Sequence, residues 1–301
     1  MHFLFAYYEV IDKAGGRCFL SGNDDCISIN KADKYYKQED TMSLLTVKNV
    51  KKIYTTRFGS VKVQALNDVN FSVEEGEYVA IMGESGSGKT TLLNILASLD
   101  TATSGQVLLN GQELSRVSQK DLCAFRRDHL GFVFQDFNLL DTMSLRDNIY
   151  LPLVLAGVSY KEMEERIVPL SKKLAIEELL DKYPYEVSGG QKQRAAVCRA
   201  LITRPDIVLA DEPTGALDSK ASGKLLHLFG EINGEGQTIL MVTHSIQAAA
   251  HAGRGLFIKD GCVFHQIYRG NRSRDEMYRM ISDALTVIQA QQEPEWRDDH
   301  E

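Results

Sequence analysis

Four short apolar runs occur along the chain, and each is followed by a glycine or a polar residue. They are residues 78–82, 131–134, 207–210 and 238–242. Continuous apolar runs of this length are typical of strands that are buried on both faces of a parallel sheet. Segments that are predicted to be helices lie between these apolar runs; they include residues 91–97 and 191–201. The pattern therefore predicts an α/β fold whose core is a parallel sheet.

The first apolar run leads into a glycine-rich segment, residues 83–90, with the sequence Gly-Glu-Ser-Gly-Ser-Gly-Lys-Thr. In such a strand–loop–helix segment the backbone N–H groups surround an anion, and the helix N-terminus adds partial positive charge. We expect Lys89 to reach the β- and γ-phosphates of a nucleotide and the Thr90 hydroxyl to bind Mg²⁺. The expected nucleotide contacts are Gly83, Glu84, Ser85, Gly86, Ser87, Gly88, Lys89, Thr90 and Thr91.

A pair of carboxylates follows the third apolar run. Asp211 and Glu212 come directly after residues 207–210. The carboxyl edge of a parallel sheet is where an α/β fold binds its ligand. Alone, an acidic pair after a strand is usually a helix cap, but the upstream phosphate loop favours a shared site. We expect Asp211 to hold Mg²⁺ through water and Glu212 to act as general base for the attacking water.

Further motifs resemble those of ABC-type ATPases and occur in that family's order. Residues 187–191, Val-Ser-Gly-Gly-Gln, are similar to the LSGGQ signature, with Val in place of Leu. Gln135 resembles the Q-loop glutamine, residues 216–218 resemble the D-loop, and His244 resembles the switch histidine. The resemblance covers residues 43–269. It implies an ATP-hydrolysing P-loop NTPase with a parallel-sheet core, an antiparallel β subdomain and an inserted helical subdomain.

The resemblance also implies roles for single residues. The implied catalytic residues are Glu212, His244, Gln135 and Lys89, and the implied Mg²⁺ ligands are Thr90, Gln135 and Asp211. His244 is expected to contact the γ-phosphate, and Asp218 is a further implied nucleotide contact. Tyr54 lies where the family has the aromatic residue that stacks on adenine, and Phe58 competes with it for this role.

The signature implies that one chain does not complete its own site. Ser188 and Gly190 start the predicted helix over residues 191–201, whose N–H groups and dipole suit a γ-phosphate. In ABC-type ATPases this helix faces the nucleotide of the opposite subunit. Ser188, Gly189, Gly190 and Gln191 are therefore expected to contact ATP that is held by a second copy of the chain.

Composition limits the classes of partner. With 34 basic against 41 acidic residues and a net charge of −7, the chain lacks the broad basic surface of a nucleic-acid-binding protein. No apolar stretch approaches the length of about 18 residues that spans a membrane. The chain contains one set of these motifs, which argues against the ABC ATPases of translation. It has no sustained heptad repeats, which argues against those of chromosome maintenance. The cysteines have no metal-ligand spacing and indicate reduced cytosolic thiols: Cys18, Cys26, Cys123, Cys198 and Cys262.

Three regions are expected along the chain. Residues 1–42 match no family element, and because the resemblance begins directly after Met42, we expect Met42 to be the native start, with a genuine extension as the alternative. Residues 43–270 are expected to form the ATPase domain, with its helical subdomain at 118–185. Residues 271–301 are expected to form a helix and an acidic tail. Apolar residues recur at a helical period over 276–292, which predicts a helix that packs back on the domain.

The finer resemblance is to bacterial ABC ATPases that work with an FtsX-like permease. Residues 131–135 and 211–218 are similar to that group, and residues 256–270 resemble the Bce-type ATPases. This implies a peripheral subunit at the cytoplasmic face of the membrane. The module would confer antimicrobial-peptide resistance or export (bacitracin or lantibiotic type) and would signal to a sensor kinase through the permease. Lipoprotein or macrolide export and cell-division signalling are the alternatives. The apolar residues within 136–150 belong either to the subdomain core or to a groove for a permease coupling helix.

Overall fold

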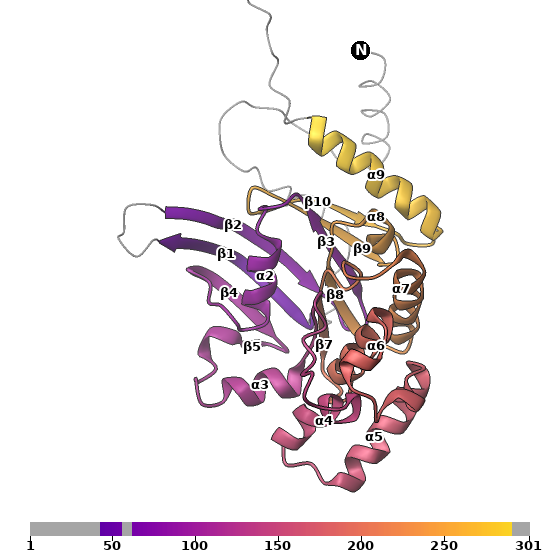
Figure 1. Ribbon diagram of the computed structural model, residues 1–301. Coiled ribbons are helices and arrows are strands. Elements are labelled where there is room, and N and C mark those ends of the chain that lie inside the picture. The colour runs from indigo at the N-terminus through magenta and orange to yellow at the C-terminus, as the bar shows by residue number, and fades with distance from the viewer. Residues whose placement is uncertain (1–42, 56–61, 291–301) are drawn as a thin grey trace, which may run out of the picture. The chain divides into compact units, whose positions relative to one another are not determined.

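The computed structural model describes residues 43–55 and 62–290, which form a ten-stranded mixed sheet with helices on both faces (Figure 1). In spatial order the strands are β5 (Gln112–Glu113), β4 (Ser104–Leu109), β1 (Leu45–Thr55), β2 (Lys62–Val73), β10 (Cys262–Tyr268), β9 (Arg254–Lys259), β3 (Tyr78–Gly83), β8 (Thr238–Val242), β7 (Ile207–Asp211) and β6 (Leu130–Val133).

One half of the sheet is parallel. Strands β9, β3, β8, β7 and β6 are parallel neighbours in that order. Every residue of β8 is buried, and so is every residue of β3 except Gly83. Because helices cover both faces, such strands need apolar residues at successive positions rather than at alternate ones. The predicted parallel-sheet core is confirmed.

The other half is antiparallel and corresponds to the predicted β subdomain. Strand β1 pairs antiparallel with β2 and β4, and β4 pairs antiparallel with β5. Strand β10 connects the two halves, because it is antiparallel to β9 and meets β2 in parallel through Cys262 and Asp68.

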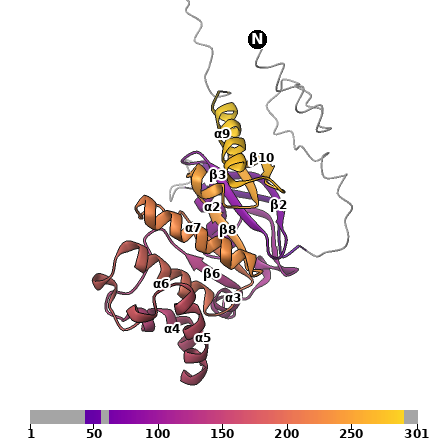
Figure 2. The same ribbon diagram turned by 90° about the vertical axis from the view of Figure 1, so that its right-hand side faces the viewer.

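The helices of the described residues are α2 (Lys89–Leu96), α3 (Leu122–His129), α4 (Leu145–Leu155), α5 (Tyr160–Lys173), α6 (Gly189–Leu201), α7 (Ser219–Gly234), α8 (Ile246–Ala249) and α9 (Arg274–Ala290), with the 3₁₀-helices η2 (Leu114–Arg116), η3 (Glu177–Leu179) and η4 (Pro184–Glu186). Helices α4, α5 and α6 are inserted between β6 and β7, and Figure 2 shows them grouped together. The range 118–185, the expected helical subdomain, also contains β6, whose residues 130–133 pair in register with β7 and overlap the strand predicted at 131–134.

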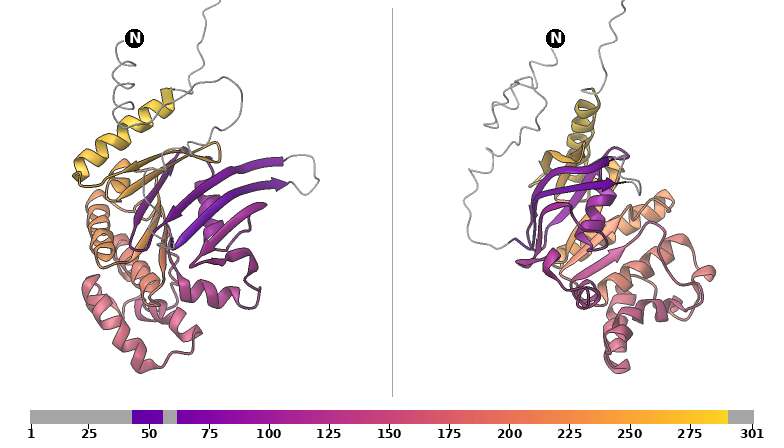
Figure 3. Two further views of the ribbon diagram at one scale, coloured as in Figure 1. Left: turned by 180° about the vertical axis from the view of Figure 1, so that it is seen from behind. Right: turned by 90° about the vertical axis from the view of Figure 1, so that its left-hand side faces the viewer.

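Side chains of β3 alternate between two apolar clusters. Tyr78, Ala80 and Met82 pack with residues of α6, α7 and α9, whereas Val79 and Ile81 pack with residues of α2. Helix α9 runs beside β9 and β10 (Figure 3), and Met277 and Ile281 on it are fully buried. The predicted packing of a C-terminal helix on the domain is therefore observed. Within the described ranges, no helix is both long and apolar enough to cross a bilayer.

Candidate nucleotide site

The phosphate loop connects the end of β3 to the start of α2. Gly88 is the N-cap of α2 with φ 100°, and an added Cβ there would lie 2.4 Å from the carbonyl oxygen of Ala65. Only glycine fits a position with both this backbone conformation and this close approach. Since glycine has no side chain to cap the helix, the first-turn N–H groups of α2 are left for an anion.

Lys89 extends across the phosphate loop. Its Nζ donates to the carbonyl oxygens of Gly83 at 2.8 Å and Glu84 at 2.6 Å. Burial lowers the pKa of Lys89 from its ordinary value, and the nearby carboxylates of Glu212, Asp211 and Glu84 oppose that shift. The lysine predicted to bind phosphate therefore shares one electrostatic environment with the predicted acidic pair.

Ser87 has a hydroxyl that fits a phosphate-binding role. Its side chain is buried, and its Oγ has no hydrogen-bond partner among the described residues. A buried hydroxyl usually has a partner, and a phosphate oxygen would accept its hydrogen bond. Together with the start of α2 and Lys89, this donor set fits the phosphates of a nucleotide.

The acidic pair lies at the carboxyl end of β7. Burial and, secondly, the neighbouring Glu212 raise the pKa of Asp211, and Lys89 opposes the rise. Glu212 has φ 44°, in the left-handed region, and its N–H donates to the carbonyl oxygen of Val242 at 2.9 Å. A non-glycine residue in this region is often found at a functional site, where the surrounding structure holds it.

The carboxylate of Glu212 is held by the segment that follows β8. The His244 N–H donates to Oε1 at 2.9 Å, and the His244 Nδ1 lies 2.8 Å from the same oxygen. The Thr243 hydroxyl donates to Oε2 at 3.1 Å. The Glu212 side chain is only 15 % exposed, whereas that of His244 is 75 % exposed. The structure therefore brings the predicted base and the predicted switch histidine into direct contact.

Gln135 lies beside the turn that follows Glu212. A Cβ added to Gly215 would lie 3.0 Å from the side-chain Cδ of Gln135, so the glycine leaves room for the glutamine. The Thr90 hydroxyl, the Asp211 carboxylate and the Gln135 amide are hard oxygen donors, which suit Mg²⁺. In the described part of the chain no three His, Cys, Asp or Glu side chains form a metal cluster. Oxygen donors of this kind fit a Mg²⁺ ion that takes its other ligands from phosphate oxygens and water.

The signature forms the N-terminus of α6. Ser188 is the N-cap; its N–H donates to Oε1 of Gln191 at 2.8 Å, and its Oγ accepts from the Gln191 N–H at 3.4 Å. This capping box fixes the start of the helix. The nearest atoms to a Cβ added at Gly189 or Gly190 belong to Phe137, Ala216, Leu217 and Ala221, not to residues 83–90.

Asp218, a predicted nucleotide contact, has a structural partner in its own chain. It is the N-cap of α7, and its Oδ1 accepts from the Ala221 N–H at 2.8 Å. Tyr54 is 42 % exposed near the end of β1; its hydroxyl donates to Oδ2 of Asp100 at 2.8 Å, and the Lys52 Nζ lies 4.8 Å from its ring centroid. The competing Phe58 lies outside the described residues. Stacking of Tyr54 on adenine stays a prediction.

Gln193 is a functional candidate that sequence patterns did not reveal. It is fully buried, and its Nε2 donates to the carbonyl oxygens of Phe134 at 3.1 Å and Pro213 at 2.8 Å. These residues are the neighbours of Gln135 and Glu212, so one side chain fixes the spacing of two site segments. The feature of the sequence that could have pointed to Gln193 is a glutamine on the buried face of a predicted helix.

Residues 136–150 have mixed burial. Leu139 packs against the larger apolar cluster, whereas Leu140 is 45 % exposed. Asn148, on α4, is fully buried; its amide donates to the carbonyl oxygens of Leu140, Met143 and Ser144 and accepts from the Leu140 N–H. The core role is therefore observed for Leu139, whereas a groove for a permease helix in this segment stays a prediction.

Comparison with known proteins agrees with this geometry. Residues 66–215 match the family described as ABC transporter. The chain is 49 % identical over 247 residues to the ABC transporter ATP-binding protein YxdL of Bacillus subtilis (strain 168), covering 82 % of this chain and 95 % of that protein. It is 44 % identical over 248 residues to the bacitracin export ATP-binding protein BceA of Halalkalibacterium halodurans, covering 82 % and 97 %.

A solved structure of a dimeric bacterial ABC transporter cassette, MJ0796, has 40 % sequence identity and a TM-score of 0.68, and the match covers 74 % of this chain and 98 % of the cassette. The same cassette is also known in a dimeric post-hydrolysis state bound to ADP and Pi, with 39 % identity and a TM-score of 0.68. The fold is thus that of a P-loop NTPase. The chain belongs to the ABC transporter family, as an ATP-binding subunit with ATPase activity.

Proposed function

We propose that this chain powers export of, or resistance to, antimicrobial peptides of the bacitracin or lantibiotic type. It would act as a dimer on an FtsX-like permease at the cytoplasmic face of the membrane. The observation that carries the ATPase half of this proposal is the Glu212 carboxylate, which Thr243 and His244 hold at the end of β7 near Lys89. The peptide half rests on the similarity to a bacitracin export protein.

The phosphate loop and its neighbours would bind the nucleotide in this proposal. Lys89, Ser87 and the N-terminus of α2 would hold the phosphate oxygens, and Tyr54 would stack on adenine. Thr90, Asp211 and Gln135 would hold Mg²⁺. When bound, that ion would neutralise charge on the β- and γ-phosphate oxygens.

Glu212 would accept the proton of the attacking water. Its carboxylate is oriented by three hydrogen-bonding contacts from Thr243 and His244, which favours one direction of attack. His244 is exposed enough to contact the γ-phosphate from the same side. Catalysis of phosphoryl transfer is mainly positioning and charge stabilisation, and both are properties of this arrangement.

A second copy of the chain would complete each site. The neighbours of the signature in its own chain are the D-loop and α7 rather than the phosphate loop. The cassettes with the same fold are dimeric. Ser188, Gly189, Gly190 and Gln191 would therefore bind the γ-phosphate of ATP held by the partner copy, with Asp218 nearby.

The peptide proposal is tested by reconstitution with the permease. We expect a peptide of the bacitracin class to stimulate the ATPase rate of the purified complex in membranes, and a macrolide to leave it unchanged. A complex carrying Glu212→Gln controls for contaminating ATPases and should show no rate with either compound. Stimulation by the macrolide alone would contradict the peptide proposal and favour macrolide export. A signalling link to a sensor kinase is a further part of the proposal.

A further inference from the structure

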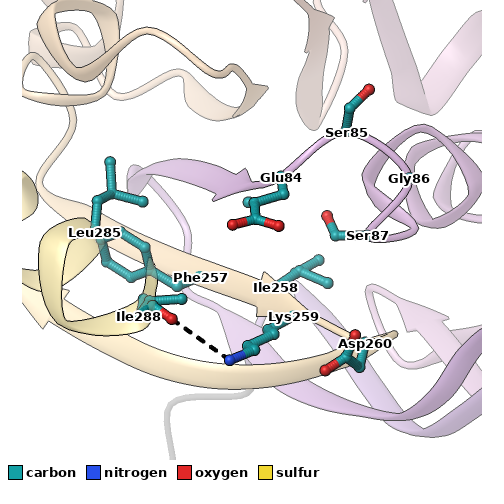
Figure 4. Close-up of a pocket in the computed structure, with 11 residues that line it drawn as sticks. Glu84, Ser85, Gly86, Ser87, Phe257, Ile258, Lys259, Asp260, Leu285 and Ile288 are labelled. Atoms are coloured by element: carbon teal, nitrogen blue, oxygen red, sulfur yellow. Dashed lines mark hydrogen bonds between the residues drawn. The ribbon is translucent and has the colours of Figure 1, made fainter. Parts of the chain in front are cut away.

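A small cavity lies behind the phosphate loop. Its volume is about 130 Å³, and its walls are residues 83–87, residues 257–260 at and just after the end of β9, and Leu285 and Ile288 of α9. Figure 4 shows Glu84 and Ser87 on one side of this space and the two α9 side chains on another. Helix α9 therefore reaches the face of the phosphate loop that borders this cavity.

Strand β9 is in close contact with the base of the phosphate loop. Gly83 pairs with Ile258 and Met82 pairs with Phe257. A Cβ added at Gly83 would lie 2.2 Å from the Ile258 carbonyl oxygen, so the space between the two backbones is too small for a side chain. A shift at the end of β9 would therefore move the start of the loop.

Lys259 connects the end of β9 to α9. Its Nζ lies 3.5 Å from the carbonyl oxygen of Ile288 and 5.6 Å from the ring centroid of Phe264 (Figure 4 shows the first contact). Ile288 lies near the end of the described part of α9. Lys259 thus contacts this part of α9 from the end of β9.

Apart from the Arg274–His251 contact at its start, the buried side chains of α9 are apolar and lie on one side of the helix. Met277, Ile281 and Ile288 are buried at helical spacing, whereas Thr286 on the same helix is exposed. Helix α9 is therefore packed on the domain along its length, and its Leu285 and Ile288 form one wall of the cavity.

The phosphate loop is restrained from within by the two hydrogen bonds of the Lys89 Nζ and by one turn bond. Gly86 and Gly88 have φ values of 83° and 100°, and the turn is closed by a 3.2 Å bond from the Ser87 N–H to the Glu84 carbonyl. A loop with two such glycines has many alternative conformations, and ordering it on binding costs affinity unless neighbours restrict it beforehand. Its neighbours outside the loop include β9, α9 and, at Gly88, Ala65 of β2.

We propose that Lys259 is a positioning residue for the phosphate loop, acting through α9, and that this support sets the affinity for ATP rather than the rate of hydrolysis. The proposal rests on the assignment of residues 83–90 to phosphate binding. The support contacts the outer face of the loop, whereas Glu212 and His244 lie at the ends of other strands. Loss of the support should therefore change binding and leave the chemical step intact.

The test measures KM for ATP and kcat in two independent variants, Lys259→Met and the double variant Leu285→Ala/Ile288→Ala. We expect KM to rise about tenfold, the change that 1.4 kcal/mol produces, with kcat within about twofold of the unsubstituted protein. Lys259→Arg keeps the cation and should restore KM. Thr286→Ala changes an exposed residue next to Leu285 and is the matched control.

An unchanged KM in both variants would overturn the proposal, and so would a loss of kcat at constant KM. If the double variant fails to fold, the KM of Lys259→Met still tests the proposal, because this substitution removes only a half-exposed ammonium group. Binding of a fluorescent ATP analogue gives the same answer without turnover. If the unsubstituted protein binds the analogue but does not hydrolyse ATP, the proposed catalytic roles fail while the support of the loop remains measurable.

Discussion

His251, which follows α8, is held in a setting that favours its neutral form. Its Nε2 lies 3.1 Å from a guanidinium nitrogen of Arg274, and only an unprotonated ring nitrogen accepts that hydrogen bond. Burial and, secondly, the charge of Arg274 lower the pKa of His251 to about 4. The contact joins the end of α8 to the start of α9.

This histidine should make stability depend on pH. The unfolded chain binds a proton at His251 below the ordinary pKa of 6.5, whereas the folded chain does so only near 4. The free energy of unfolding should therefore fall as pH falls through this window. Urea unfolding of the unsubstituted protein and His251→Gln at pH 7.5 and 5 measures the effect. The variant should lose less stability over this interval, and an equal loss in both proteins would refute the assignment.

Single residues were predictable from sequence where a motif carries them. Lys89, Glu212 and His244 were expected at one site, and the structure brings them into one electrostatic and hydrogen-bonded group. Gln193 and Thr243 were not expected, because their partners come from other segments of the chain. Contacts between segments depend on the packing of β6, β7 and β8, which no local pattern contains.

At the scale of elements, Asn148 organises the segment between Gln135 and α4. Its four hydrogen bonds to residues 140–144 are partly buried, and they hold a segment that has no regular secondary structure of its own. Asn148→Ala would leave the Leu140 N–H without this partner and would remove one hydrogen bond from each of three carbonyl groups. A buried polar group that loses its partner costs about 1–3 kcal/mol, so we expect the free energy of unfolding to fall by an amount in this range.

Chemical denaturation measures this loss, and Thr142→Ala is the matched control in the same segment. Thr142 is exposed, so its substitution should change stability by less than about 0.5 kcal/mol. Equal effects of the two substitutions would contradict the role of Asn148.

Elements were predictable where their pattern is strong. Strand β8 coincides with its predicted range, and α9 begins and ends two residues before its predicted bounds. Strands β1 and β2 were not delimited, because their registers shift at irregular positions such as those between Val47 and Lys52. Irregular pairing interrupts the alternation of apolar and polar residues on which a strand prediction depends.

At the scale of the whole molecule, the predicted nucleotide contacts lie in two places. Residues 83–90 lie between β3 and α2, whereas the signature starts α6 beside the D-loop. The family order of the motifs predicted this division, and the similarity to a dimeric cassette agrees with it. Which permease binds could not be predicted, because the specificity of transport depends on another polypeptide.

In the proposed mechanism, ATP joins two chains through the signature. Sedimentation of Glu212→Gln with and without ATP tests it most directly, because this variant should bind ATP without hydrolysing it. We predict a monomer without nucleotide and a dimer with ATP, and we predict that Glu212→Gln/Ser188→Arg binds ATP but stays monomeric. A single variant that binds ATP and remains monomeric, or a double variant that dimerises equally well, would contradict the account.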